Sequence, residues 1–378
     1  MRVPPDRDID LVLVTGAGAS REFGVNYTNL PLMKEWCASL LISLRRGAPG
    51  FAEAVGLSEY MSGPDFENRL GIFLAAAQAF PAIKTLVDPL GTMLAASPPA
   101  THGNSNNTWE SWHGQAQHQL EQVMAVIHSS LYENFGEPSY DPGLVQNAFQ
   151  TLLAHLGITR TSRWVYATTN YDVIADAAIE ALGAGVDDGT AQRRFQPSAE
   201  RSFRVEGLVG RMGRDVPLIH LHGRIGWYSR TGVGSGTGPY ALDHVRAYDP
   251  AQGVPLVMLP DPNKDPDNGN VVIGEMWLEF RHALERAKRV LVLGHSLHDD
   301  PLVGALSAHA PRPGLAVALL SAVDNPDDFD ADATAVEAKL VERLPEAHRI
   351  LMRFGPQYGP SPPPTMTEWL TFTSDERR

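Results

Sequence analysis

The feature that most constrains the fold is a set of continuous apolar runs along the chain. The first, "IDLVLVTGAGAS" at residues 9–20, shows no polar alternation before its glycines. A strand of this kind is buried on both faces, which is typical of a parallel sheet covered by helices on each side. Further runs of this type occupy residues 162–170, 216–223, 287–297, 314–323 and 348–355.

Helical patterns separate several of these runs. The stretch "DVIADAAIEALG" begins at Asp172, a residue type that favours a helix cap. In "EMWLEFRHALERA" the apolar residues Trp277, Phe280 and Leu284 recur on one helical face. Strands that alternate with helices predict an α/β fold with a largely parallel, Rossmann-like sheet.

One long segment, residues 31–160, breaks this alternation with helical patterns alone. We therefore expect a discontinuous Rossmann-like domain at 1–30 and 161–356, a helical insertion at 31–160 and a C-terminal tail at 357–378. Inside the insertion, residues 96–114 are rich in Ser, Asn, Gly and Pro, which predicts a loop.

Composition excludes some classes of function. The 378 residues carry 31 basic and 44 acidic side chains, a net charge of −13, which argues against direct nucleic-acid binding. The single cysteine, Cys37, cannot form an intrachain disulfide or a Cys-rich zinc site. His102, His113 and His118 have no carboxylate or thiolate at ligand spacing, so we expect no metal. With no signal-peptide pattern and no apolar run of membrane-spanning length, we expect a cytoplasmic protein without membrane contact.

The first strand ends in a glycine turn, Gly16-Ala17-Gly18. Such a turn lets the backbone approach a pyrophosphate, and it also serves as a plain tight turn. Arg21 stands where a dinucleotide fingerprint has its third glycine, and Glu35, near the expected spacing of the ribose-binding acid, falls in a helical pattern. An ordinary hydride-transferring dehydrogenase therefore fits poorly.

A second strand ends in "TTNYD", where Thr168, Thr169 and Asn170 replace apolar residues. These residue types are common where a chain turns, because their side chains bond the nearby backbone. Alternatively, Asn170 holds a ligand at the end of the sheet.

Four short motifs occur in order, each at the end of a predicted strand. Together they resemble the successive signatures of the sirtuin (SIR2) superfamily, and most of all its bacterial SIR2-like NADase branch in anti-phage defence. The resemblance covers about residues 10–305, with most of the insertion outside it. The motifs are "GAGAS" with "FGV" (16–25), "TTNYD" (168–172), "HLHG" (220–223) and "GHSLHDDPLV" (294–303).

The resemblance implies a role for each matching residue. Asn170 would orient the nicotinamide ribose and the attacking water, and His222 would be the catalytic histidine, a general base. Asp172 matches the acid beside Asn170, although it could equally cap the following helix. His220 would face the opposite side of the strand, as a core residue. The residues matching NAD contacts are Gly16, Ala17, Gly18, Ser20, Thr169, Gly294 and Ser296.

The chain also departs from deacylase sirtuins. It lacks their two Cys-x-x-Cys zinc pairs, and Val25-Asn26-Tyr27-Thr28 stands where they carry a Pro-Asp-Phe-Arg stretch. The resemblance therefore implies hydrolysis of NAD⁺, as substrate, to nicotinamide and ADP-ribose. Two alternatives remain open: a sensor that binds NAD or ADP-ribose without turnover, and a protein deacylase.

The branch that the motifs resemble works in large, regulated assemblies. This implies a homo-oligomer and a separate partner protein, such as a HerA-like ATPase or a short Argonaute. The helical insertion at 31–160 is the expected surface for these contacts.

Overall fold

The computed structural model divides into two compact units. Unit 1 comprises Met1–Leu32, Tyr132–Met258 and Lys264–Arg378, and unit 2 comprises Met33–Leu131 and Leu259–Asn263. Every site residue expected from the sequence lies in unit 1. The structure describes residues 8–23, 33–47, 109–135, 140–172, 174–192, 200–229, 238–242, 245, 247–259, 271–311, 314–320, 336–352, 354 and 364–375.

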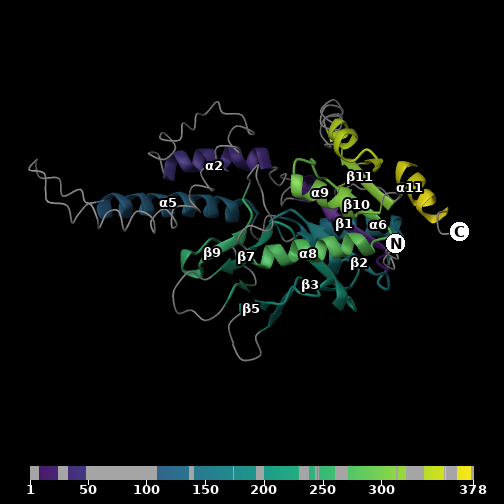
Figure 1. Ribbon diagram of the computed structural model, residues 1–378, viewed down its shortest axis with the longest axis horizontal. Coiled ribbons are helices and arrows are strands. Elements are labelled where there is room, and N and C mark those ends of the chain that lie inside the picture. Colours follow the sequence, from purple (N-terminus) through teal and green to yellow (C-terminus); the bar gives the residue numbers. More distant parts are fainter. Residues whose placement is uncertain are drawn as a thin grey trace, which may run out of the picture. The chain divides into compact units, whose positions relative to one another are not determined.

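Unit 1 is built on a seven-stranded sheet in which every strand pair is parallel. The predicted Rossmann-like α/β fold is thereby confirmed, with one additional short strand, β3 (Figure 1). The strands in spatial order are β12 (His348–Met352), β11 (Leu315–Leu320), β10 (Val290–Leu293), β1 (Leu11–Thr15), β2 (Trp164–Thr168), β6 (Asp215–His220) and β3 (Gly185–Asp187).

Helices cover both faces of this sheet. Because side chains alternate along a strand, Val12 and Val14 of β1 point into one hydrophobic cluster, while Leu11 and Leu13 point into another. The first cluster includes residues of α8 (Val271–Arg286) and α9 (Asp300–His309). The second includes residues of α6 (Pro142–His155), α7 (Ile174–Glu180) and α11 (Pro364–Asp375).

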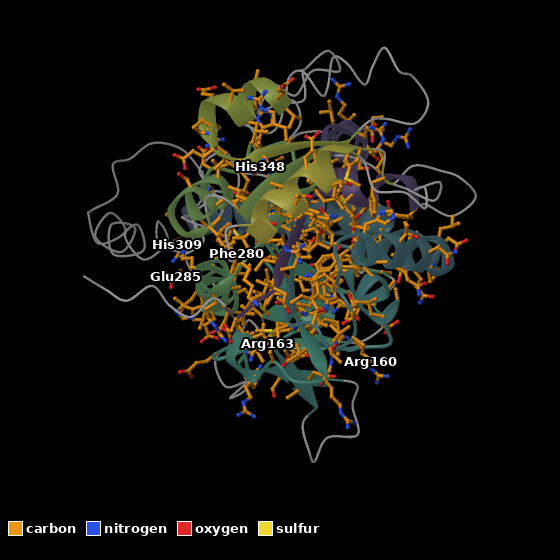
Figure 2. All side chains as sticks on the ribbon, turned by 90° about the vertical axis from the view of Figure 1, so that its right-hand side faces the viewer. Arg160, Arg163, Phe280, Glu285, His309 and His348 are labelled. Carbon is orange, nitrogen blue, oxygen red and sulfur yellow. The ribbon has the colours of Figure 1, made fainter. Side chains whose placement is uncertain are left out.

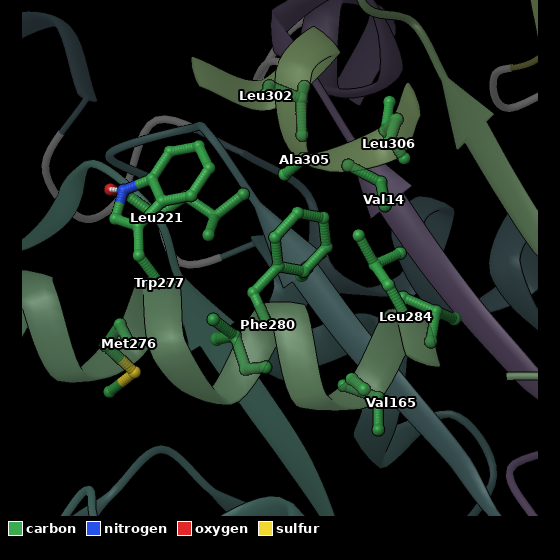
Figure 3. Packing of buried hydrophobic residues seen from close by; sticks show 14 of the residues in the cluster. Val14, Val165, Leu221, Met276, Trp277, Phe280, Leu284, Leu302, Ala305 and Leu306 are labelled. Atoms are coloured by element: carbon green, nitrogen blue, oxygen red, sulfur yellow. Dashed lines mark hydrogen bonds between the residues drawn. The ribbon is translucent and has the colours of Figure 1, made fainter. Parts of the chain in front are cut away.

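Helix α8 is the main support of the first face. Phe280 and Trp277 are buried, and Figure 3 shows Phe280 pointing from α8 toward Val14 and α9. Full burial of such side chains stabilises a fold by about 2–3 kcal/mol each. The Trp277 indole also donates to the carbonyl of Leu221 at 2.8 Å. Helix α8 thus holds the backbone next to His222.

A second, antiparallel sheet follows directly from the first. The chain leaves β6 at His220, passes through Leu221 and His222, and enters this sheet at Gly223. The sequence did not predict it, because four of its five strands have only three or four residues, too few to show a period of two. Its strands in spatial order are β4 (Thr190–Gln192), β5 (Glu200–Phe203), β8 (Tyr240–Leu242), β7 (Gly223–Ser229) and β9 (Val254–Val257).

Unit 2 contains α2 (Met33–Gly47) and most of α5 (Trp109–Phe135). The helical pattern expected in this segment is confirmed for α5, where Val123, Ile127 and Leu131 recur at helical spacing and are buried. Trp36 is also buried, and its indole donates to the hydroxyl of Ser130 at 3.2 Å. This bond joins α2 to α5.

Three boundaries differ from the expectation. Residues 109–114, expected in a loop, begin α5, and the Gln, Ala and Gln residues that follow at 115–117 favour a helix. His113 and His118 therefore lie on that helix. Helix α6 belongs to unit 1, where Phe149 and Leu152 pack in the second cluster.

Residues 357–378 were expected to form a C-terminal tail. Part of this segment instead forms helix α11, whose Met366 and Trp369 are buried in the second cluster. The Pro-rich sequence before this helix favoured the prediction of a tail. Residues 96–108 of the loop expected at 96–114 lie outside the described residues. None of the described helices is long and apolar enough to cross a membrane.

We predict that Gly223→Ala severely destabilises the protein. Gly223 has φ +76°, and a Cβ there would lie 1.9 Å from the carbonyl oxygen of Leu256. Backbone strain of about 1–2 kcal/mol then adds to a clash with strand β9. Gly207→Ala is the matched control, because Gly207 has φ +71° with nothing within 4 Å of the added Cβ. Urea denaturation should show a loss of at least about 3 kcal/mol for Gly223→Ala, and equal losses for the two variants would contradict the prediction.

Candidate active site

The residues expected at the site follow the ends of four neighbouring strands. Thr15 of β1 pairs in register with Leu293 of β10 and Thr168 of β2, and Thr168 pairs with His220 of β6. The carboxyl ends of β10, β1, β2 and β6 thus lie side by side. In open α/β sheets this edge is where ligands bind.

The opposite edge of the sheet has a different character. Asp8 pairs with Arg286 at 2.7 Å and with Arg163, labelled in Figure 2, at 3.0 Å. Asp10 pairs with Lys288 at 2.7 Å. These ion pairs are partly exposed, and such pairs contribute little more than about 1 kcal/mol each. This edge is therefore structural.

The glycine turn after β1 packs backbone to backbone against the turn after β10. A Cβ on Gly16 would lie 2.7 Å from the carbonyl oxygen of Gly294, and one on Gly294 would lie 2.1 Å from the nitrogen of Ala19. Gly294 also has φ +66°. The N–H groups of Gly16, Gly18 and Ala19 donate to chain carbonyls. These glycines thus serve close packing, and three of the N–H groups expected to face phosphate already have partners.

The two threonines at the end of β2 bond the backbone. The N–H and hydroxyl of Thr169 both donate to the carbonyl of Thr15, at 3.0 and 3.4 Å. The hydroxyl of Thr168 accepts from the N–H of Asn170 at 3.0 Å. Thr169, expected to contact a ligand, therefore joins β2 to β1 and fixes the start of the Asn170 turn.

Asn170, Ser20 and Asp172 form a buried chain of hydrogen bonds. The Asn170 amide donates to the Ser20 hydroxyl at 2.8 Å and to the carbonyl of Gly16 at 3.2 Å. The Ser20 hydroxyl donates in turn to the Asp172 carboxylate. With its nitrogen held in this way, Asn170 keeps its carbonyl oxygen as the group with acceptor capacity.

Asp172 has two functions in this arrangement. Its Oδ1 accepts from the N–H of Ile174 at 3.0 Å, so the expected role at the start of α7 is confirmed. Burial raises the pKa of the Asp172 carboxyl to about 6, against the opposing effects of the bonds from Ile174 and Ser20. The carboxyl therefore changes its charge close to neutral pH.

His222 lies at the junction of the two sheets. Its carbonyl accepts from the N–H of Met258 at 2.7 Å, while the N–H of Leu221 donates to Thr168 at 2.9 Å. The imidazole Nε2 lies 2.6 Å from Oδ2 of Asp299, and both side chains are about 95% buried. A carboxylate oxygen this close to a ring nitrogen makes an ion pair when the imidazole is protonated, so Asp299 favours the imidazolium form.

Asp299 is the residue that sequence reasoning missed. It is the N-cap of α9, with Oδ1 accepting from the N–H of Leu302 at 3.1 Å. Its second oxygen contacts His222. The sequence signal, an acid before Pro301, predicts the cap, and nothing in the pattern indicates the second contact.

Tyr171 lines the other side of the histidine. Its ring centroid lies 6.4 Å from that of His222, and its hydroxyl donates to the carbonyl of Met258. The imidazole thus has the Asp299 carboxylate and the Tyr171 ring as neighbours.

His220 is separate from this group, as expected. It is fully buried and packs edge-on against Trp227, with ring centroids 5.1 Å apart. Burial lowers the pKa of His220 to about 3, so the ring is neutral. The prediction of a core histidine is confirmed.

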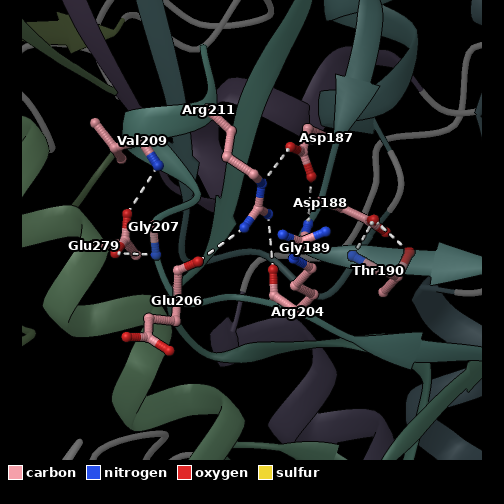
Figure 4. Close-up of polar contacts among 10 residues, drawn as sticks. All are labelled: Asp187, Asp188, Gly189, Thr190, Arg204, Glu206, Gly207, Val209, Arg211 and Glu279. Carbon is pink, nitrogen blue, oxygen red and sulfur yellow. Dashed lines mark hydrogen bonds and ion pairs between the residues drawn. The ribbon is translucent and has the colours of Figure 1, made fainter.

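Two other buried acids are structural. The Glu279 carboxylate accepts from the N–H groups of Gly207 and Val209 at 2.9 and 2.8 Å (Figure 4). Asp188 accepts from Thr190 and pairs with Arg224 at 3.2 Å. Both carboxylates are satisfied by neighbouring chain segments.

The remaining expected residues lie at the rim. Ala17 and Gly18 are partly exposed, and Ser296 is exposed after β10. Across the described ranges of the chain, no group of three or more His, Cys, Asp or Glu side chains is arranged to hold a metal ion.

Neither a protein-family profile nor a curated protein sequence matches the chain. Among solved structures, one match is a serine-to-alanine mutant of a Sir2 homologue in complex with ADP-ribose. The two are 12% identical, with a TM-score of 0.28 over 66% of this chain and 90% of that chain. Because identity and TM-score are this low, the roles of individual residues are argued from this chain's own geometry.

We predict that Asp172→Asn changes the pH dependence of stability. A carboxyl whose folded pKa exceeds its unfolded value stabilises the fold fully below about pH 4 and loses that contribution as pH rises through the folded pKa, about 6. The full difference corresponds to roughly 3 kcal/mol. Relative to wild type, Asp172→Asn should therefore gain stability between pH 4 and 6 and level off above. Urea denaturation across this range tests it, with the exposed Asp215→Asn as control; a flat difference would refute the shift.

Proposed function

We propose that the chain is a SIR2-like NAD⁺ glycohydrolase, which converts NAD⁺ and water to nicotinamide and ADP-ribose. The observation that carries this proposal is the buried His222–Asp299 pair beside the Asn170–Ser20–Asp172 chain, at the carboxyl edge of four parallel strands. Buried polar side chains are costly, so their concentration at one edge supports a catalytic role.

The reaction breaks the bond between the ribose C1′ and the cationic nicotinamide nitrogen. The bonding electron pair leaves with nicotinamide, and a water oxygen forms the new bond to C1′ and loses a proton. Such reactions pass through an oxocarbenium-like state. They require a fixed ribose, an oriented water and a base, and covalent catalysis is unnecessary.

Asn170 suits the orienting role. Its amide nitrogen is held by Ser20 and Gly16, so the carbonyl oxygen has a defined direction. We assign it to accept a hydrogen bond from a ribose hydroxyl or from the attacking water. Positioning of this kind contributes several kcal/mol to catalysis.

His222 suits the role of general base. We assign the proton of the neutral ring to Nε2, next to Asp299, and we assign Nδ1 to accept the proton that the water loses. Asp299 then stabilises the resulting imidazolium. The Asp172 carboxylate, largely ionised above pH 6, favours positive charge developing at C1′.

The proposal assigns the rest of NAD⁺ to the rim of the edge. Gly16, Ala17 and Gly18 would border the diphosphate, and Gly294 and Ser296 the adenosine. Ala17, Gly18 and Gly294 are partly exposed and Ser296 is exposed, so a ligand can reach them. Thr169 would support the site from behind through Thr15.

The motif resemblance extends the proposal to context. We infer an effector that depletes NAD⁺ in anti-phage defence, in the cytoplasm, within a homo-oligomer and with a separate partner such as a HerA-like ATPase or a short Argonaute. The helical insertion expected at 31–160 is the proposed surface for such contacts.

We predict that His222→Ala and Asn170→Ala each abolish NAD⁺ cleavage in a folded protein. Loss of a positioned base costs about 10²–10⁴-fold in rate. The measurement is chromatography of nicotinamide and ADP-ribose formed from NAD⁺ over time. His282→Ala, which removes a half-exposed imidazole on α8, is the matched control and should keep full activity.

Full activity in a folded His222→Ala would overturn the assignment of the base. Binding of ADP-ribose by wild type without any cleavage, even with its partner present, would favour the sensor instead. Release of acetate from an acetylated peptide would favour the deacylase.

A further inference from the structure

We infer that Arg343 is a positioning residue for the His222–Asp299 pair, acting through the loop between β10 and α9. The expected effect on the rate of NAD⁺ hydrolysis rests on the proposed function. The expected effect on the orientation of His222 rests on the geometry alone. Arg343 lies far beyond Asp299 in the sequence, at the end of the helical residues 336–343.

The loop is unusually constrained at Leu297. Leu297 has φ 57°, the only positive φ of a non-glycine residue within the described part of the chain. This conformation costs about 1–3 kcal/mol and persists only where surrounding contacts impose it. Leu297 is fully buried, and its N–H donates to Nδ1 of His295 at 2.9 Å.

The carbonyl group of Leu297 and a residue after it in the chain are contacted by Arg343. Its NH1 donates to the carbonyl of Leu297 at 2.7 Å, and its NH2 donates to the carboxylate of Asp300. Asp299 lies between these two contacts in the chain. The planar guanidinium thus contacts the backbone of Leu297 and the side chain of Asp300, which flank Asp299 in the chain, a geometry that a lysine ammonium cannot reproduce.

The helix that carries Arg343 is itself anchored. Leu340 and Leu344 are buried in the first hydrophobic cluster, together with residues of α8 and α9. Lys339, one helical turn before Arg343, contacts His298 of the same loop. Two side chains at i and i+4 thus reach the loop from one face of a packed helix.

The consequence is a continuous connection from the helix to the base. Arg343 holds Leu297 and Asp300, the loop between them presents Asp299, and Asp299 orients the imidazole of His222. Removing Arg343 should release the strained loop and allow the carboxylate to move. A displacement of about 1 Å at such a position can reduce a rate by up to about 10²-fold.

The test compares Arg343→Met with Arg349→Met. Arg349 lies on β12 and pairs with Glu337, on the helix that carries Arg343, at 2.6 Å. Both side chains of this pair are partly exposed, so Arg349→Met controls for the loss of a guanidinium. We expect Arg343→Met to lower kcat for NAD⁺ hydrolysis by about tenfold or more with KM little changed. Arg349→Met should match wild type, and Arg343→Lys should recover only part of the loss.

A double mutant separates positioning from general damage. If Arg343 acts through Asp299, adding Arg343→Met to Asp299→Asn should cause no further loss of kcat. Losses that multiply, or equal kcat values for Arg343→Met and Arg349→Met, would overturn the inference.

A readout independent of turnover is the imidazole nitrogen NMR spectrum of His222, assigned with His222→Gln. We expect the Nε2–H tautomer in wild type and Arg349→Met, and a mixture of tautomers in Arg343→Met. An unchanged Nε2–H tautomer in Arg343→Met would overturn the inference. Absence of NAD⁺ cleavage in wild type, with the NMR difference present, would count against the proposed hydrolase and leave the positioning role supported.

Discussion

Burial on both faces confines the polar chemistry of this sheet to the ends of its strands. Along β1 and β10 the side chains are apolar, because α8 and α9 cover one face and α6, α7 and α11 the other. Immediately after β1, β2 and β6 the chain places Ser20, Asn170, Asp172 and His222. Parallel register brings these ends together, so the candidate site follows directly from the topology of the sheet.

Within that edge, several side chains serve structure and chemistry together. Asp172 bonds the start of α7 with one oxygen and receives the Ser20 hydroxyl. Asp299 caps α9 with one oxygen and contacts His222 with the other. A buried histidine and carboxylate stabilise each other only as a pair, and removing one leaves an uncompensated charge that costs about 3–5 kcal/mol.

Sequence reasoning predicted the parts of the fold that rest on long, uniform patterns. Apolar runs such as residues 9–20 identify the main strands, and the spacing of Trp277, Phe280 and Leu284 identifies the buried face of α8. The antiparallel sheet was not predicted, because several of its strands are too short to show periodicity. Helix α11 was not predicted, because the prolines before it suggested a tail.

The candidate site was only partly accessible from sequence. Motif order singled out Asn170 and His222, which the structure places after adjacent strands. Asp299 was not among the residues expected from sequence, because the direction of its second oxygen depends on the turn after β10. Arg343 lies in no motif, and its role depends on where a later helix packs. Contacts between distant segments leave no local pattern, so the orienting residues required the structure.

The central claim is that these strand ends form the binding and reaction site for NAD⁺. The most direct measurement is a crystal structure of the His222→Ala protein with NAD⁺, which removes the base and retains Asn170. We expect the nicotinamide ribose next to Asn170 and the diphosphate along the Gly16–Gly18 turn. NAD⁺ bound at any other edge of the sheet, or no binding at millimolar concentration, would contradict the claim.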